Sequence, residues 1–188
     1  MSIFLDQAAL WAKGKLWQVR LPLFVWFAYL FFRYSTNPEY YSILSYLNLG
    51  IHEVGHLIFS PFGTFIGVFG GTLFQCFVPV FAIFNFYRQE DFFSIALSFG
   101  WLCISLFDVA KYVGDASSMN LPLVSPFGGE GNTIHDWNYL LSKMGILQYD
   151  TLLSWLVKIA AVFSMLACLG FGAWLLWRMI LSHGSLEE

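Results

Sequence analysis

Two histidines and a glutamate interrupt an apolar run that otherwise avoids charge. The run reads Gly50-Ile51-His52-Glu53-Val54-Gly55-His56-Leu57-Ile58-Phe59. On a helix, His52 and His56 leave the same face one turn apart and can take adjacent positions on one metal ion, with Glu53 about 100° round. In this His-Glu-x-x-His pattern the histidines bind zinc and the glutamate acts as a general base. The alternative is a chance match on a core helix.

The composition is typical of a membrane protein. Hydrophobic residues make up 58% of the 188 and charged residues 11%, whereas soluble domains carry about 25% charged residues. The mean hydropathy is +0.65. This length predicts a single membrane-embedded domain over residues 1–188. The net charge of -3 offers no basic surface, so nucleic acid is not an expected partner.

The hydropathy pattern predicts an all-α polytopic membrane protein with about five transmembrane spans, in a range of four to six. An N-terminal helix within residues 3–19 is expected to lie in the membrane interface. The spans are expected at about residues 17–34, 39–60, 64–87, 92–113 and 152–181. Asn37-Pro38 separates the first two. Residues 114–134 form a long loop rich in Gly, Ser and Pro, a kind of loop that is usually functional or disordered.

Polar side chains follow one face of the span that carries the motif. On a helical wheel they fall within about 140° of one another, and they are Ser45, Asn48, His52, Glu53 and His56. The next span places Gly63, Gly67, Gly71, Gln75 and Pro79 at four-residue intervals, which predicts a groove that another helix backbone can approach. A buried Gln75 needs hydrogen-bond partners, from packing or from a substrate backbone.

Further candidate ligands come from the fourth span and from the end of the long loop. Asp108 is an ionisable residue inside a span, so it is a functional-site candidate, with an ion pair to Lys111 as the alternative. His135 is either a metal ligand or a neighbour of a helix cap. Asp136 stands where a helix start is expected.

The predicted topology brings these candidates to one side of the membrane at similar depth. A catalytic zinc ion takes three protein ligands and keeps one position for water, so the third ligand is Asp108 or His135. Whichever of Asp108 and His135 is not a ligand could orient a ligand through its second nitrogen or bind substrate. Further candidates for these roles are Gln75, Asn48, Asp115 and Asp136. A structural zinc site would instead use His52, His56, Asp108 and His135 together.

With the motif on a membrane helix, the chain resembles the site-2 protease group of intramembrane zinc metalloproteases. The segment His52-Glu53-Val54-Gly55-His56 matches the family pattern fully, and Gly71-Thr72-Leu73-Phe74-Gln75 matches its second element loosely. Asp108 matches as an aspartate on the corresponding helix. The resemblance implies a metalloprotease core within residues 40–145, zinc as cofactor, and cleavage of membrane-spanning protein substrates. His135 stays open as the third ligand.

Two other functions remain open at this point. One is a membrane metal-dependent hydrolase of a lipid or small amphiphile, and the other is a non-catalytic metal-binding membrane protein. Membrane lipid and a transmembrane protein substrate are the expected partners. Lys and Arg residues number six on the side where the motif helix ends and three on the other. The positive-inside rule therefore predicts a site near the cytoplasmic face of an integral, multi-pass protein.

Overall fold

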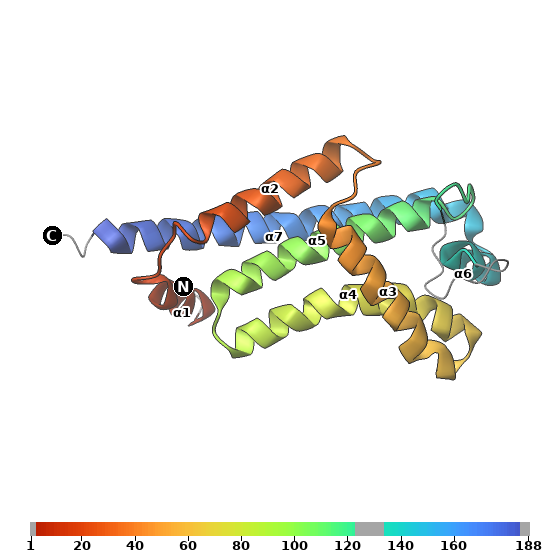
Figure 1. Ribbon diagram of the computed structural model, residues 1–188, viewed down its shortest axis with the longest axis horizontal. Helices are drawn as coiled ribbons and strands as arrows, with labels where there is room; N and C mark the ends of the chain where they lie inside the picture. The colour runs from red at the N-terminus through yellow and green to blue at the C-terminus, as the bar shows by residue number, and fades with distance from the viewer. Residues whose placement is uncertain (1–2, 123–133, 185–188) are drawn as a thin grey trace. The chain divides into compact units, whose positions relative to one another are not determined.

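The computed structural model describes residues 3–122 and 134–184, and the prediction of an all-α fold is confirmed for this part of the chain (Figure 1). No strand occurs in these two ranges. The elements are α1 (Ile3–Ala12), α2 (Leu21–Thr36), α3 (Ile43–Phe59), the 3-10 turn η1 (Ser60–Phe62), α4 (Thr64–Arg88), α5 (Phe92–Gly114), α6 (Asp136–Met144), the 3-10 turn η2 (Leu147–Tyr149) and α7 (Asp150–Gly184).

Three helical segments are long and apolar enough to cross a membrane. They are Thr64–Arg88, Phe92–Gly114 and Leu147–Ser182. The other helices are shorter, with 10 residues in α1, 16 in α2 and 17 in α3. The expected break at Asn37-Pro38 is confirmed, because α2 ends one residue before Asn37. The five spans and the interfacial position of α1 stay predictions.

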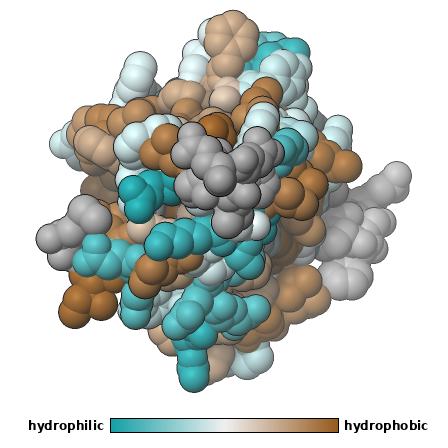
Figure 2. All heavy atoms as spheres, turned by 90° about the vertical axis from the view of Figure 1, so that its left-hand side faces the viewer, coloured by the Kyte–Doolittle hydropathy of each residue, from teal (hydrophilic) through white to brown (hydrophobic). Residues whose placement is uncertain are grey.

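Much of the apolar surface of these helices faces outward. In the most apolar stretch of α4, 33% of the residues are buried inside the protein, and in that of α7, 39%. Figure 2 shows large hydrophobic side chains exposed on the surface beside a group of hydrophilic ones. Soluble proteins rarely expose apolar surface on this scale, so a lipid environment explains it.

The chain forms two compact units, and α4, α5 and α7 contribute residues to both. The first unit contains residues 1–40, 79–103 and 162–188. Its core includes Ala8 and Ala12 of α1 together with Phe92, Leu175 and Met179. The single-domain prediction is not tested by this division and stays a prediction.

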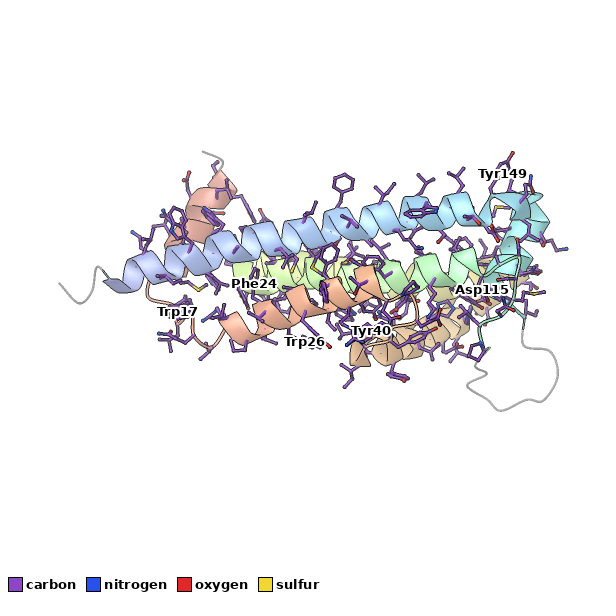
Figure 3. The ribbon with its side chains drawn as sticks, turned by 90° about the horizontal axis from the view of Figure 1, so that it is seen from above. Trp17, Phe24, Trp26, Tyr40, Asp115 and Tyr149 are labelled. Atoms are coloured by element: carbon purple, nitrogen blue, oxygen red, sulfur yellow. The ribbon has the colours of Figure 1, made fainter. Side chains whose placement is uncertain are left out.

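Small residues of the first unit admit large aromatic rings. Phe24, labelled in Figure 3, points from α2 toward α7, and a Cβ added to Gly172 would lie 2.9 Å from its ring. A Cβ added to Gly100 would likewise meet the ring of Phe27. Small residues allow this kind of close packing between helices in membrane proteins.

The second unit contains residues 41–78 and 104–161. Within it α3 crosses α4 at glycines, since a Cβ added to Gly55 would lie 2.9 Å from the Cα of Gly71 and would also collide with the carbonyl oxygen of Gly70. The predicted glycine groove is therefore occupied by α3. Gly63 joins η1 to α4 with φ at +97°, a backbone conformation that favours glycine.

Candidate metal centre

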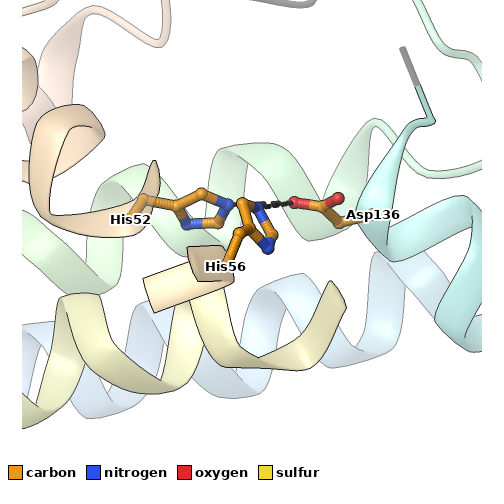
Figure 4. A group of neighbouring side chains, drawn as sticks. All are labelled: His52, His56 and Asp136. Atoms are coloured by element: carbon orange, nitrogen blue, oxygen red, sulfur yellow. Dashed lines mark hydrogen bonds and ion pairs between the residues drawn. The ribbon is translucent and has the colours of Figure 1, made fainter. Parts of the chain in front are cut away.

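The side chains of His52, His56 and Asp136 meet at one point in the second unit (Figure 4). Asp136 Oδ2 lies 2.9 Å from His52 Nε2 and 3.1 Å from His56 Nε2. The three ligand-type atoms are all within 4.8 Å of one another. The two histidines stand one turn apart on α3, and Asp136 is the first residue of α6. This buried group could bind a metal ion.

The imidazole of His52 is held by the side chain of Gln75. His52 Nδ1 lies 3.0 Å from Gln75 Oε1, and Gln75 Nε2 donates to the carbonyl oxygen of Ser105 at 3.3 Å. Because that carbonyl can only accept, the amide must direct its oxygen toward His52. His52 Nδ1 is therefore the donor, and in the neutral imidazole Nε2 carries a lone pair.

The imidazole of His56 is held in the same tautomer by the backbone. His56 Nδ1 lies 2.9 Å from the carbonyl oxygen of Gly67, so Nδ1 donates and Nε2 again presents a lone pair. Two lone pairs and a carboxylate oxygen thus converge on one place, and only a cation or protons can satisfy them. Metal-ligating histidines typically donate their other N–H to a carbonyl in this manner, and the donor set suits zinc.

Asp136 is fixed through its backbone as well as its side chain. Its backbone N–H donates to the Tyr112 hydroxyl at 3.0 Å. Burial raises the pKa of Asp136, but hydrogen bonds and positive charge from His52 and His56 outweigh burial and hold that pKa below its usual value.

Gly71 lies directly against the two imidazoles. A Cβ added there would be 2.6 Å from His52 Nε2 and 2.7 Å from His56 Nε2. Real Cβ atoms do not approach other atoms this closely, so glycine leaves the space that the converging ligand atoms need.

Asp108 lies apart from this group, in a polar network between α3 and α5. Its carboxylate accepts a hydrogen bond from Ser45 Oγ at 3.1 Å and one from Asn48 Nδ2 at 2.8 Å. Asn48 Oδ1 in turn accepts from Ser105 Oγ at 3.1 Å. The structure thus brings Asn48 and Asp108 together.

His135 also lies apart from the group and caps α6. Its Nδ1 accepts the backbone N–H of Asn138 at 3.2 Å, and its Nε2 lies 3.2 Å from Asp115 Oδ2. The Asp115 carboxylate, labelled in Figure 3, also accepts from the backbone N–H groups of Asn120 and Leu121 at 2.9 and 3.0 Å. Burial raises the pKa of Asp115, but these hydrogen bonds, with those from Ser118 and His135, lower it below its usual value.

A cavity of about 870 Å³ opens beside the group, and much of its wall is apolar. Glu53 lines it together with His52, His56 and Asp136, and the Glu53 carboxylate interacts electrostatically with all three. Asp108 and Gln75 line other parts of the wall. Every member of the motif therefore borders one space that is large enough for a small substrate or a short peptide segment.

Comparisons of the chain with protein-family models, curated proteins and solved structures find no match. The resemblance to site-2 proteases therefore stays a prediction.

Asp136 is the residue whose place beside the histidines went unrecognised in the sequence. It was expected to orient a ligand or to start a helix, and it does start α6. His135 directly precedes Asp136, so both stand at the end of the predicted loop, and the sequence holds no signal that separates them. Tyr112, which binds the backbone of Asp136, was not assigned a role.

Proposed function

We propose that this chain is a membrane-embedded zinc metalloprotease that hydrolyses peptide bonds of membrane proteins. The observation that carries the proposal is the shared tautomer of the two motif histidines. His52 and His56 both donate through Nδ1 to fixed carbonyl oxygens and both direct Nε2 toward Asp136. A helix core has no need of this convergence, whereas a zinc site requires it.

In this proposal His52, His56 and Asp136 hold the zinc ion. When bound, zinc acts as a Lewis acid and makes water acidic enough to lose a proton near neutral pH. Glu53 accepts that proton while water adds to the carbonyl carbon of the substrate, and it then returns the proton to the nitrogen of the leaving amine. The wall of the cavity holds the peptide segment against these groups.

The number of ligands supports catalysis over a structural role. In the part of the chain that the structure describes, the group has three ligand-type side chains, and a structural zinc site would fill all four positions with protein ligands. Asp108 and His135, which would complete such a site, are engaged with Asn48 and Asp115.

The cavity also favours a second candidate function. A volume near 870 Å³ with a largely apolar wall is in the range of small-molecule sites. The same zinc and Glu53 chemistry could then hydrolyse an ester or amide of a lipid or small amphiphile.

Three helices long and apolar enough to cross a membrane support a multi-pass protein, and the excess of Lys and Arg on the side where the motif helix ends supports a site near the cytoplasmic face. Reaction of single introduced cysteines with a membrane-impermeant thiol reagent tests it. If a cysteine in the α4–α5 turn were labelled from the cytoplasmic side, the proposed orientation would be wrong and the opposite one would hold.

Glu53→Gln tests the catalytic role, with the exposed Glu90→Gln as a matched control. Both variants are purified in detergent, their zinc content is measured by mass spectrometry, and they are assayed on quenched fluorescent transmembrane peptides and on ester-linked amphiphiles. We expect Glu53→Gln to keep its zinc and lose turnover, while Glu90→Gln keeps both. Turnover of the amphiphile alone would favour the second candidate, and unchanged turnover in Glu53→Gln would exclude Glu53 as the base.

A further inference from the structure

The phenol of Tyr112, on α5, lies against two of the three side chains of the candidate metal centre. Its hydroxyl accepts the backbone N–H of Asp136 at 3.0 Å. Its ring makes a T-shaped contact with the imidazole of His52, with centroids 6.0 Å apart, and a tilted contact with that of His135 at 4.4 Å. Tyr112 also lines the cavity, and all of these residues belong to the second unit.

The backbone N–H of Asp136 requires an acceptor from outside its own helix. Asp136 is the first residue of α6, and the first four N–H groups of a helix find no carbonyl oxygen within that helix. The capping residue, His135, accepts the N–H of Asn138 through its Nδ1. The Tyr112 hydroxyl supplies the acceptor for Asp136, so this hydrogen bond attaches the start of α6 to α5.

The same hydroxyl also interacts with the carboxylate of Asp136. A phenol oxygen that accepts a hydrogen bond keeps its own hydrogen to donate, and the Tyr112 hydroxyl interacts with the Asp136 side chain as well as with its backbone. The carboxylate oxygen Oδ2 lies 2.9 Å from His52 Nε2 and 3.1 Å from His56 Nε2. One hydroxyl therefore restrains both the backbone and the side chain of the residue that meets the two histidines.

We propose that Tyr112 is a positioning residue for the candidate metal centre, and that its hydroxyl holds the Asp136 carboxylate beside the Nε2 atoms of His52 and His56. This inference rests on the metal site of the proposed function and is independent of the substrate. Carboxylates that bind metal ions are themselves commonly held by hydrogen bonds from neighbouring groups. Without the hydroxyl, the first turn of α6 loses its attachment to α5, and the carboxylate can turn away from the histidines.

Tyr112→Phe removes the hydroxyl and keeps the ring that packs against His52 and His135. Zinc affinity of the full-length protein is measured in detergent by competition with a chelator, and by equilibrium dialysis where binding is weak. We expect Tyr112→Phe to weaken zinc binding about 10–100-fold, as for other outer partners of metal ligands. Tyr139→Phe on α6 is the matched control, because the Tyr139 ring contacts Lys143 at 5.8 Å and this contact does not need the hydroxyl. We expect the control to bind zinc as wild type does.

A double-mutant cycle with Asp136→Ala separates positioning from a general effect on the fold. Asp136→Ala removes the carboxylate, so the Tyr112 hydroxyl no longer has a ligand to hold. We expect Asp136→Ala alone to weaken zinc binding more than about 100-fold, and Tyr112→Phe to add about two-fold or less in that background. A hydroxyl that only stabilises the fold would weaken zinc binding equally in both backgrounds, and that result would overturn the proposal.

Two further measurements complete the test. Helical circular dichroism of zinc-free Tyr112→Phe should match that of wild type; loss of the helical signal would show that the hydroxyl is needed for the fold, and would overturn the positioning role. Wild-type zinc affinity in Tyr112→Phe would overturn it too, even if turnover fell, because the hydroxyl would then act on the substrate. A wild type that binds zinc without hydrolysing any substrate would overturn the protease alone, and one that binds no zinc would overturn both.

Discussion

His52 Nε2 lies 2.9 Å from Asp136 Oδ2, although 84 residues separate the two along the chain. The contact joins the middle of α3 to the first residue of α6. Asp136 is the third ligand-type side chain beside the two motif histidines. The backbone of Asp136 is also fixed, because its N–H donates to the Tyr112 hydroxyl. The candidate metal centre therefore depends on how α6 begins as much as on the motif.

Gly71→Ala should abolish zinc binding without unfolding the protein. The added methyl group would lie under 3 Å from the Nε2 atoms of His52 and His56, so both imidazoles must turn away from the metal position. Gly50→Ala on α3 is the control, since a Cβ there meets nothing within 4 Å. Zinc content and helical circular dichroism of the two variants check this, and retained zinc in Gly71→Ala would contradict the placement of the imidazoles.

His135→Asn should keep zinc, whereas His135→Ala should weaken the start of α6. Asparagine is a good N-cap residue and can replace Nδ1 as acceptor for the Asn138 N–H, while alanine cannot; loss of a cap costs about 1 kcal/mol. Thermal unfolding and zinc affinity of the two variants separate the roles. If His135 were a metal ligand, both substitutions would release zinc to a similar extent.

The Asp115 carboxylate should make the protein less stable in acid. Its folded pKa is lower than its ordinary value of 3.8, so its stabilisation is fully present above that value and is lost as the pH falls through the folded pKa. Asp115→Asn should lower the stability by about 2 kcal/mol at neutral pH, since hydrogen bonds to a charged group are lost. Its melting temperature should then fall less than that of wild type between pH 5 and pH 3 (about one unit either side of the ordinary value). If the melting temperatures of the two proteins fell in parallel with pH, the ionised Asp115 carboxylate would contribute nothing to stability.

The sequence predicted the helices and the candidate side chains of the site better than it predicted which side chains contact one another. Composition and periodicity were sufficient to predict an all-helical chain. The four-residue glycine spacing was sufficient to predict that another helix, which is α3, approaches α4 closely. Gln75 was expected to need partners, and His52 and Ser105 supply them. The partners of Asp108 and His135 depend on side-chain positions from three helices and a loop. The spacing of residues along one helix cannot predict those positions.

The same limit explains why Asp136 was not placed beside the histidines. Helical periodicity brings His52 and His56 together because they share one element, but Asp136 belongs to α6 and lies 84 residues from His52 in the sequence. The predicted topology placed His135 and Asp136 on the same side of the membrane, and no local sequence pattern distinguished the two.

The zinc affinity of Asp136→Asn compared with Asp108→Asn tests the metal centre most directly. Both substitutions replace a carboxylate by an amide of the same shape, so packing is preserved while the negative charge and one acceptor oxygen are lost in each. We predict that Asp136→Asn loses zinc by more than about 100-fold, beyond the effect of an outer partner, while Asp108→Asn stays within a few-fold of wild type. Loss of zinc in Asp108→Asn together with full binding in Asp136→Asn would contradict the account.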